Sequence, residues 1–561
     1  MTDSLPSSLT SRIPPEVFNE IFSHLPQNAL LAFRALDHRL GALATAHAFR
    51  HVHLGAREDK GDHELLINVA RSENLRHLIR EITCDTWVGL NFRYNAHASY
   101  PLPSEFLNAL PYLRFFRNLS TLHVVFSSFC GHTFFDPYES IEETTDFRYR
   151  VLDTVFRSVA GTWSAEQQAA TDQTLQEMCY QMKYFEPVYD QIVPDVSDDD
   201  IASRIPLKTL TISNLGDYND ERLTNSDAFK SVLESKELVD LKLQITTQAY
   251  DPAPEEELYL CDKYDFFAAL PSTWLSPTVA GNLNTMSLYC RDYWGWNPKM
   301  DFRAVRPGLG VDSGFPNLKV LALGRYVFSH EWQVDWIASL GRQNGRGGLE
   351  ELYLDNCPIM YHAYHLKPLD ESTTVIGKDK NGDGIVVSNE GYHRRDVLAH
   401  RPPTQRGGGR THDKREFPLR WHTILSQWNE SMNGLRVFKM GCGALTSSSV
   451  NMGHFLQNHG DIGRGDCSID RHAFRYFDCL SPPPEDTPFE DIDDDKYASG
   501  VGLSQDRNRI LQYAYFGGSD TCLVDRNRPW YRIPERENTD SQDELALEVF
   551  SATVKARRMR G

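Results

Sequence analysis

One segment of the sequence carries oxygen-bearing side chains at calcium-binding spacing. Residues 379–390 read Asp-Lys-Asn-Gly-Asp-Gly-Ile-Val-Val-Ser-Asn-Glu, which matches the ligand spacing of an EF-hand loop. The possible ligands are Asp379, Asn381, Asp383 and Glu390. An EF-hand also needs a helix on each side, whereas the β-branched residues before and within this loop favour strands. We therefore expect a surface β-hairpin near residues 372–391, with calcium binding as the alternative and no metal site elsewhere.

The sequence lacks several common catalytic motifs. It contains no Gly-x-x-x-x-Gly-Lys-Ser/Thr loop, no His-Glu-x-x-His helix and no Gly-x-Ser-x-Gly elbow. The ten cysteines form no Cys-x-x-Cys pair, and we interpret them as reduced thiols of an intracellular protein. We expect no catalytic residue and no cofactor. An enzyme remains a separate possibility, which a pocket of convergent carboxylates or histidines would favour.

A cluster of aromatic residues follows one of the strand-like segments. It consists of Tyr289, Tyr293, Trp294 and Trp296. If these rings line a binding rim, Tyr293, Trp294 and Trp296 could anchor a protein substrate, because aromatic side chains dominate many interfaces. The alternative is that they fill the core of an insertion.

Seven segments share a Leu-x-x-Leu-x-Leu pattern, allowing Met or Phe at some positions. They begin at Leu119, Leu207, Leu238, Leu283, Leu318, Leu349 and Leu435. Amphipathic helical stretches precede several of them. A helix, a tight turn and a short strand bury their apolar faces only against neighbouring copies. We therefore predict an α/β fold of the leucine-rich-repeat solenoid type, a horseshoe with a small helical domain at its N-terminus.

The spacing of these segments is irregular and predicts insertions. We expect a degenerate solenoid over residues 56–475, with the hairpin near 372–391 and a mobile Pro/Gly-rich loop near 401–415. After it the periodicity fades, and residues 476–561 are expected to form an acidic linker followed by a C-terminal cap and tail.

Residues 1–55 are dense in short helix signals. Between Ile13 and Leu25 the apolar residues recur at three- and four-residue steps, and two further short helices are expected after Pro26 and near Asp37. Three such short helices cannot bury much apolar surface alone. A partner or a following domain must therefore cover them.

The run from Ile13 to Ala44 resembles the F-box motif, and Phe49–Leu54 resembles the strand that often follows it in fungal F-box proteins with leucine-rich repeats. The resemblance implies docking to the Skp adaptor and, through it, to cullin and RING subunits of a ubiquitin ligase. The chain would then be the non-catalytic subunit that recognises an unknown protein substrate. The residues implied in Skp binding are Ile13, Pro14, Val17, Ile21, Leu25, Leu30, Leu31 and Leu36. The alternative is a leucine-rich-repeat interaction scaffold unconnected to ubiquitination.

Composition and charge bound the remaining possibilities. With 40% hydrophobic residues in 561, the chain is expected to fold, and its formal charge of −19 disfavours nucleic acid as a ligand. The sequence shows neither a signal peptide nor an apolar run long enough to span a bilayer, so no membrane association is expected. We predict a cytoplasmic or nuclear location, or both.

Overall fold

The computed structural model describes most of the chain in a series of ranges. The described residues are 13–25, 27–36, 38–57, 61–88, 103–126, 130–131, 143–181, 203–246, 261–305, 314–365, 368–379, 381–393, 413–441, 511–516, 521–523 and 537–560. The acidic linker expected after residue 476 and most of the loop expected near 401–415 lie outside these ranges.

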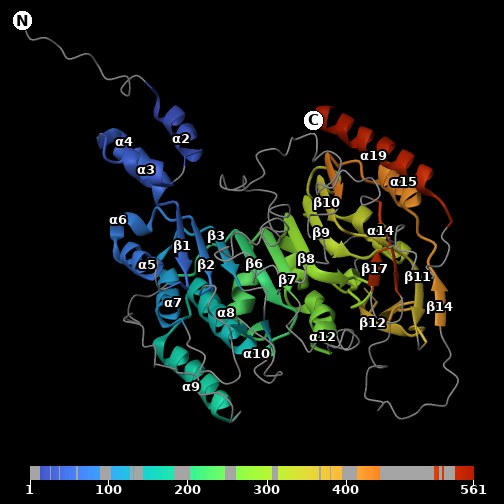
Figure 1. Cartoon of the computed structure of the whole chain (residues 1–561), viewed down its shortest axis with the longest axis horizontal. Coiled ribbons are helices and arrows are strands. Elements are labelled where there is room, and N and C mark those ends of the chain that lie inside the picture. The colour runs from blue at the N-terminus through green and yellow to red at the C-terminus, as the bar shows by residue number, and fades with distance from the viewer. Residues whose placement is uncertain are drawn as a thin grey trace, which may run out of the picture.

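Three short helices form a small unit at the N-terminal end. They are α2 (Pro15–Ser23), α3 (Gln27–Phe33) and α4 (His38–Ala48), as the sequence predicts. Their shared core consists of Phe18, Phe22, Leu30, Leu40, Ala44 and Ala48. This core is distinct from the main core of the protein, although Phe49 packs against both. In Figure 1 the three helices stand beyond the first strand of the central sheet.

The body is organised around one sheet of nine parallel strands whose order follows the chain. The strands are β1 (His51–Gly55), β2 (Glu81–Asp85), β3 (Thr121–Val125), β6 (Thr209–Gly216), β7 (Asp240–Thr246), β8 (Thr285–Trp294), β9 (Val320–Tyr326), β10 (Glu351–Asp355) and β15 (Val437–Gly441). Because β1 pairs with β2, the sheet already begins within the predicted N-terminal domain of residues 1–55. Figure 1 shows the strands running side by side across the molecule.

Helices connect the strands and share a core with one face of the sheet. They are α5 (Asp62–Arg71), α6 (Glu73–Arg76), α7 (Ser104–Ala109), η2 (Leu110–Phe115), α8 (Thr145–Ala160), α9 (Ala165–Gln181), α10 (Glu221–Thr224), α11 (Asp227–Leu233), α12 (Cys261–Ala269), η4 (Leu270–Ser272), α13 (Pro277–Asn282), η5 (Phe302–Ala304), α14 (Glu331–Ser339) and α15 (Trp421–Ser431). Side chains alternate along each strand, so Leu122 and Val124 join the core while Thr121 and His123 point to the opposite, polar face.

Backbone hydrogen bonds keep the first residues of the strands in register. The residue before each strand donates its N–H to the carbonyl of the residue before the preceding strand: Arg80 to Arg50 at 2.9 Å, and Ser120 to Arg80 at 2.9 Å. The same contact recurs along the sheet as far as Arg436, whose N–H donates to Glu350 at 2.8 Å. Side chains at these positions are therefore neighbours across the edge of the sheet.

The predicted leucine-rich-repeat solenoid is wrong. Each of the seven Leu-x-x-Leu-x-Leu segments contains a strand, but the strands assemble into a large parallel sheet with helical connections, an α/β fold. The pattern misleads because any parallel strand with one face packed against helices alternates apolar and polar residues in the same way. The connections also vary widely in length, and α8 alone spans 16 residues, so there is no constant repeat unit.

A second, mixed sheet lies beside the last strands of the central one. Its order is β14 (Asp413–Glu416), β11 (Ile359–His365), β16 (Tyr513–Phe516) and β17 (Thr521–Leu523). The end of the predicted mobile loop is therefore strand β14. Part of the expected C-terminal cap consists of β16, β17 and the helix α19 (Asp540–Arg560), which lies along α15 (Figure 1). Two minor strands, β4 (Cys130–Gly131) and β5 (Glu143–Thr144), pair ahead of α8.

Candidate functional site

Helix α2 presents two apolar faces, of which only one is buried. Phe18 and Phe22 are 7% and 1% exposed and fill the core of the three-helix unit. Val17 and Ile21, which are also four residues apart, are 46% and 45% exposed. Residues spaced by four lie on the same side of a helix. The two aliphatic side chains therefore form a solvent-facing stripe beside the buried phenylalanine stripe.

Helix α3 and the turn after it also expose large apolar side chains. Leu31 is 44% exposed on α3, and Leu36, in the turn before α4, is 65% exposed. Ten large apolar side chains are exposed among the described residues, and four of them fall between positions 17 and 36. Exposed apolar side chains concentrated in this way mark interaction surfaces. We refer to Val17, Ile21, Leu31 and Leu36 as the aliphatic surface.

The base beneath the aliphatic surface is fixed by aromatic packing and backbone contacts. The ring of Phe22 lies 5.8 Å from that of Phe18 and 5.3 Å from that of Phe33. Arg39 on α4 donates from Nη2 to the carbonyl of Ile13 at 3.0 Å, which ties the segment just before α2 to the third helix. A Cβ added at Gly41 would lie 3.0 Å from the carbonyl oxygen of Arg34. Glycine therefore permits α4 to approach the end of α3.

The remaining residues implied in Skp binding lie in different environments. Pro14 is exposed and precedes α2 as its N-cap, and Pro15 follows it at the first helical position, where proline is favoured. Ile13 and Leu25 are half-buried against the small core. Leu30 is only 4% exposed and belongs to that core. The prediction that Leu30 contacts a partner is therefore wrong, since its neighbour Leu31 occupies the solvent-facing position.

The aromatic cluster is core rather than a binding rim. Trp294 and Trp296 are both 0% exposed. Trp294 donates from Nε1 to the carbonyl of Gly324 at 2.7 Å, and Trp296 donates to the carbonyl of Gly391 at 3.0 Å. Their proposed role as substrate anchors is thus wrong, because buried indoles with satisfied N–H groups cannot reach a partner. Tyr293 is half-buried and donates to Oδ1 of Asn356 at 3.0 Å.

The calcium-like segment is a β-hairpin, which confirms the preferred interpretation. Strands β12 (Thr373–Lys378) and β13 (Gly384–Ser388) pair antiparallel. Oδ1 of Asp379 accepts the backbone N–H groups of Asn381 and Asp383 at 2.9 and 2.8 Å, so this carboxylate closes the turn. Glu390 is bound to Arg415 at 2.8 Å, and the guanidinium lowers the pKa of the Glu390 carboxyl. The described residues contain no group of three or more side chains suited to holding a metal ion.

Titratable groups in the body are mostly paired or buried. Burial raises the pKa of Cys84, Cys130 and Cys290 to about 12, so these thiols are neutral at physiological pH and poor nucleophiles. At the carboxyl ends of the strands, Lys263 on α12 lies 3.8 Å from Asp217 and 2.8 Å from Asp292. The carboxyl-end edge of a parallel sheet is where α/β proteins commonly place reactive groups. Here the carboxylates form ion pairs that attach a helix to the strands.

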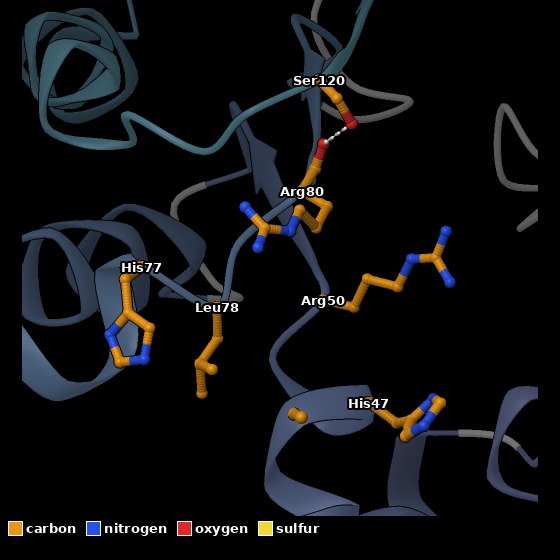
Figure 2. A pocket seen from close by; sticks show the side chains of 7 residues that line it. His47, Arg50, His77, Leu78, Arg80 and Ser120 are labelled. Atoms are coloured by element: carbon orange, nitrogen blue, oxygen red, sulfur yellow. Dashed lines mark hydrogen bonds between the residues drawn. The ribbon is translucent and has the colours of Figure 1, made fainter. Parts of the chain in front are cut away.

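A basic pocket lies where the three-helix unit meets the body, and sequence reasoning missed it. Its lining is Ala46, His47, Arg50, His77, Leu78, Arg80 and Ser120, around a cavity of about 400 Å³ (Figure 2). Arg50, Arg80 and Ser120 each directly precede a strand of the sheet. Aligning the starts of successive strand segments would have placed these three residues together, so the sequence did contain the signal.

No protein-family model matches the chain, and no curated protein matches it. Among the described helices, none combines the length and the apolarity needed to cross a bilayer.

Proposed function

We propose that the chain is a substrate-recognition subunit of a Skp-cullin-F-box type ubiquitin ligase. Helices α2 to α4 dock the Skp adaptor, which brings the cullin and RING subunits, and the α/β body binds the protein to be ubiquitinated. The protein itself performs no bond chemistry in this role; it raises the local concentration of a substrate lysine near the charged enzyme.

The observation that supports this proposal is the aliphatic surface on a unit whose sequence resembles the F-box. The three-helix unit has its own core, so exposing Val17, Ile21, Leu31 and Leu36 does not contribute to its stability. Exposed apolar side chains of this kind are expected on a surface that docks a partner. Full burial of one aliphatic side chain is worth about 1.5–3 kcal/mol. These four side chains are about half exposed, so docking could gain on the order of 1 kcal/mol from each.

Substrate binding is assigned to the polar face of the sheet near β1 to β3. His51 and His53 are exposed on β1, and Thr83 on β2 is half-buried beside them. Nε2 of His51 lies 2.9 Å from Oγ1 of Thr83, and Nε2 of His123 lies 3.2 Å from Oε1 of Glu81. Polar side chains linked across neighbouring strands form a hydrogen-bonding surface suited to a protein partner.

The decisive experiment measures affinity of the full-length chain for purified Skp adaptor. The test variant combines Ile21→Asp and Leu31→Asp, which place charges on the aliphatic surface. We expect adaptor affinity to fall more than tenfold, since each tenfold corresponds to about 1.4 kcal/mol. The melting temperature should stay close to that of the wild type, because both side chains already face solvent.

Leu545→Asp provides a matched control, since Leu545 is 62% exposed but lies on α19. It should bind the adaptor as the wild type does. If the wild-type chain fails to bind, or if the double variant binds equally well, the ubiquitin-ligase proposal is wrong. An interaction scaffold unconnected to ubiquitination then takes its place.

A further inference from the structure

We propose that the basic pocket between the three-helix unit and the body is a binding site for a small phosphorylated molecule. The lining comes from α4 (Ala46, His47), the residue before β1 (Arg50), the connection from α6 to β2 (His77, Leu78, Arg80) and the residue before β3 (Ser120). The cavity of about 400 Å³ falls within the size range of small-ligand sites. A ligand there would touch both parts of the protein.

The charge of the lining selects for an anion. Two arginines, two histidines and a serine face the pocket, and no carboxylate is among the lining residues. This is a local exception in a chain whose formal charge is −19. Guanidinium groups bind phosphate oxygens in pairs of parallel hydrogen bonds. Phosphate is therefore the chemical group that these residues suit best.

Both arginines have donors available for a ligand. Arg80 uses Nη1 to donate to the carbonyl of Asn118 at 3.1 Å, which orients its guanidinium and leaves its other N–H groups free to bind. Arg50 is exposed, and within the described part of the chain its side chain makes no hydrogen bond or ion pair. The hydroxyl of Ser120 donates to the carbonyl of Arg80 at 3.1 Å, as Figure 2 shows.

The histidines are placed to respond to a bound anion. Nδ1 of His77 lies 3.1 Å from the carbonyl oxygen of Glu73, so that nitrogen is the donor and Nε2 is left for another partner. Partial burial and the positive charge of Arg50 lower the pKa of His47. A phosphate group beside Arg50 would offset that charge and favour the protonated imidazole.

Figure 2 shows that the arginines extend to different sides of the pocket. The Arg80 guanidinium lies on the side of His77 and Leu78, whereas the Arg50 guanidinium extends in the opposite direction, on the side of His47. A ligand with two anionic groups, such as a bisphosphate, could use both sides at once. Leu78 and Ala46 supply apolar surface to the lining. The pocket therefore suits a compact molecule with more than one phosphate better than a single inorganic ion.

The test uses the full chain with defined probes in isothermal titration calorimetry at constant ionic strength. Inorganic pyrophosphate is the main probe, and inorganic phosphate and chloride are comparison anions. We expect saturable pyrophosphate binding, weaker phosphate binding and no response to chloride. The combined variant Arg50→Gln and Arg80→Gln should weaken pyrophosphate binding at least tenfold. Pyrophosphate should also raise the melting temperature of the wild type, because binding to the folded state alone stabilises it.

Arg436→Gln is the matched control, since Arg436 precedes β15 as Arg50 precedes β1 but lies at the other end of the sheet. It should bind pyrophosphate with wild-type affinity, and circular dichroism should show that all variants are folded. Equal loss in the control would indicate non-specific charge attraction and overturn the site. Absence of saturable binding, or binding only of a phosphoserine peptide, would equally overturn the assignment to a small molecule. The test needs no adaptor, so it is independent of the proposed ligase role.

Discussion

Asp543 and His422 lie 121 positions apart in the chain, yet Oδ1 of Asp543 accepts the backbone N–H of His422 at 2.8 Å. His422 is in the first turn of α15, so a carboxylate from α19 caps the start of that helix. At the other end of α15, Arg557 donates to the carbonyls of Met432 and Asn429 at 2.9 and 2.8 Å. The two helices therefore run parallel, and α19 supplies a negative group at one terminus of α15 and a positive group at the other, as the helix dipole favours.

Removal of the Asp543 carboxylate should destabilise the protein. Its Oδ2 also accepts from the hydroxyls of Tyr513 and Thr539, so Asp543→Ala leaves several buried donors without an acceptor. We expect the free energy of unfolding to fall by about 3 kcal/mol in urea denaturation, combining a lost cap with unsatisfied buried groups. Glu544→Ala, at the exposed neighbouring position, should change it by no more than about 0.5 kcal/mol. Equal effects of the two variants would contradict the capping role.

Trp294 should behave as a core residue. Its indole lies 5.4 Å from the ring of Phe267 and 4.9 Å from that of Tyr326. Trp294→Ala should therefore lower the free energy of unfolding by about 3–5 kcal/mol, and Trp294→Phe should cost less because it retains most of the ring contacts. Chemical denaturation of both variants checks this order. A loss of partner binding with unchanged stability would instead return Trp294 to a binding surface.

The hairpin of β12 and β13 should neither bind calcium nor be needed for folding. We expect calcium titration of the wild type to show no saturable heat and Asp379→Ala to melt within a few degrees of it. Replacing residues 376–385 by Asn-Gly, which favours a tight hairpin turn, should also preserve the fold. The cut spares Asn389 and Gly391, which accept hydrogen bonds from Lys299 and Trp296. Saturable calcium binding that disappears in Asp379→Ala would refute this prediction.

His330 should make the protein sensitive to mild acid. Burial is the main reason that the pKa of His330 is lowered to about 4, and nearby Arg415, Arg303 and Lys299 lower it further. Between pH 6.5 and about 4 the unfolded chain binds a proton on this histidine that the folded protein does not. The free energy of unfolding therefore has its full value with respect to His330 above pH 6.5, where the ring is neutral in both states. It declines as the pH falls toward 4, because only the unfolded chain takes up the proton.

The variant His330→Phe should isolate this effect. The phenyl ring can keep the stacking on Tyr392, whose ring is 4.2 Å away, but it cannot titrate and it loses the bond to the carbonyl of Glu390. We expect a lower melting temperature than wild type at pH 7.5 and a smaller drop between pH 7.5 and pH 5. The same drop in both proteins would show that other groups control the acid sensitivity.

Local pattern predicted the strands well but not their assembly. Apolar residues alternate wherever a strand has one buried face, and every Leu-x-x-Leu-x-Leu segment indeed contains a strand. How the strands assemble into the α/β sheet depends instead on the long connections between them. The same limit explains the misplaced aromatics. Trp296 is buried partly by Phe516, 5.1 Å away but 220 positions further along the chain, a contact that no local pattern reveals. On α3, Leu30 and Leu31 were indistinguishable because seven residues are too few to fix the phase of a helix face.

The packing of α19 on α15 also predicts the effect of premature stop codons. A premature stop between residues 442 and 539 would remove Asp543, Phe550 and Arg557 together and leave the outer side of α15 and the Phe438 ring without their cover, since Phe550 lies 4.9 Å from Phe438. Such a truncated product would keep eight or more strands of its sheet and yet expose apolar surface to the cell's quality-control machinery. Nonsense alleles late in the coding sequence should therefore behave as losses of protein abundance, not as shortened but working versions.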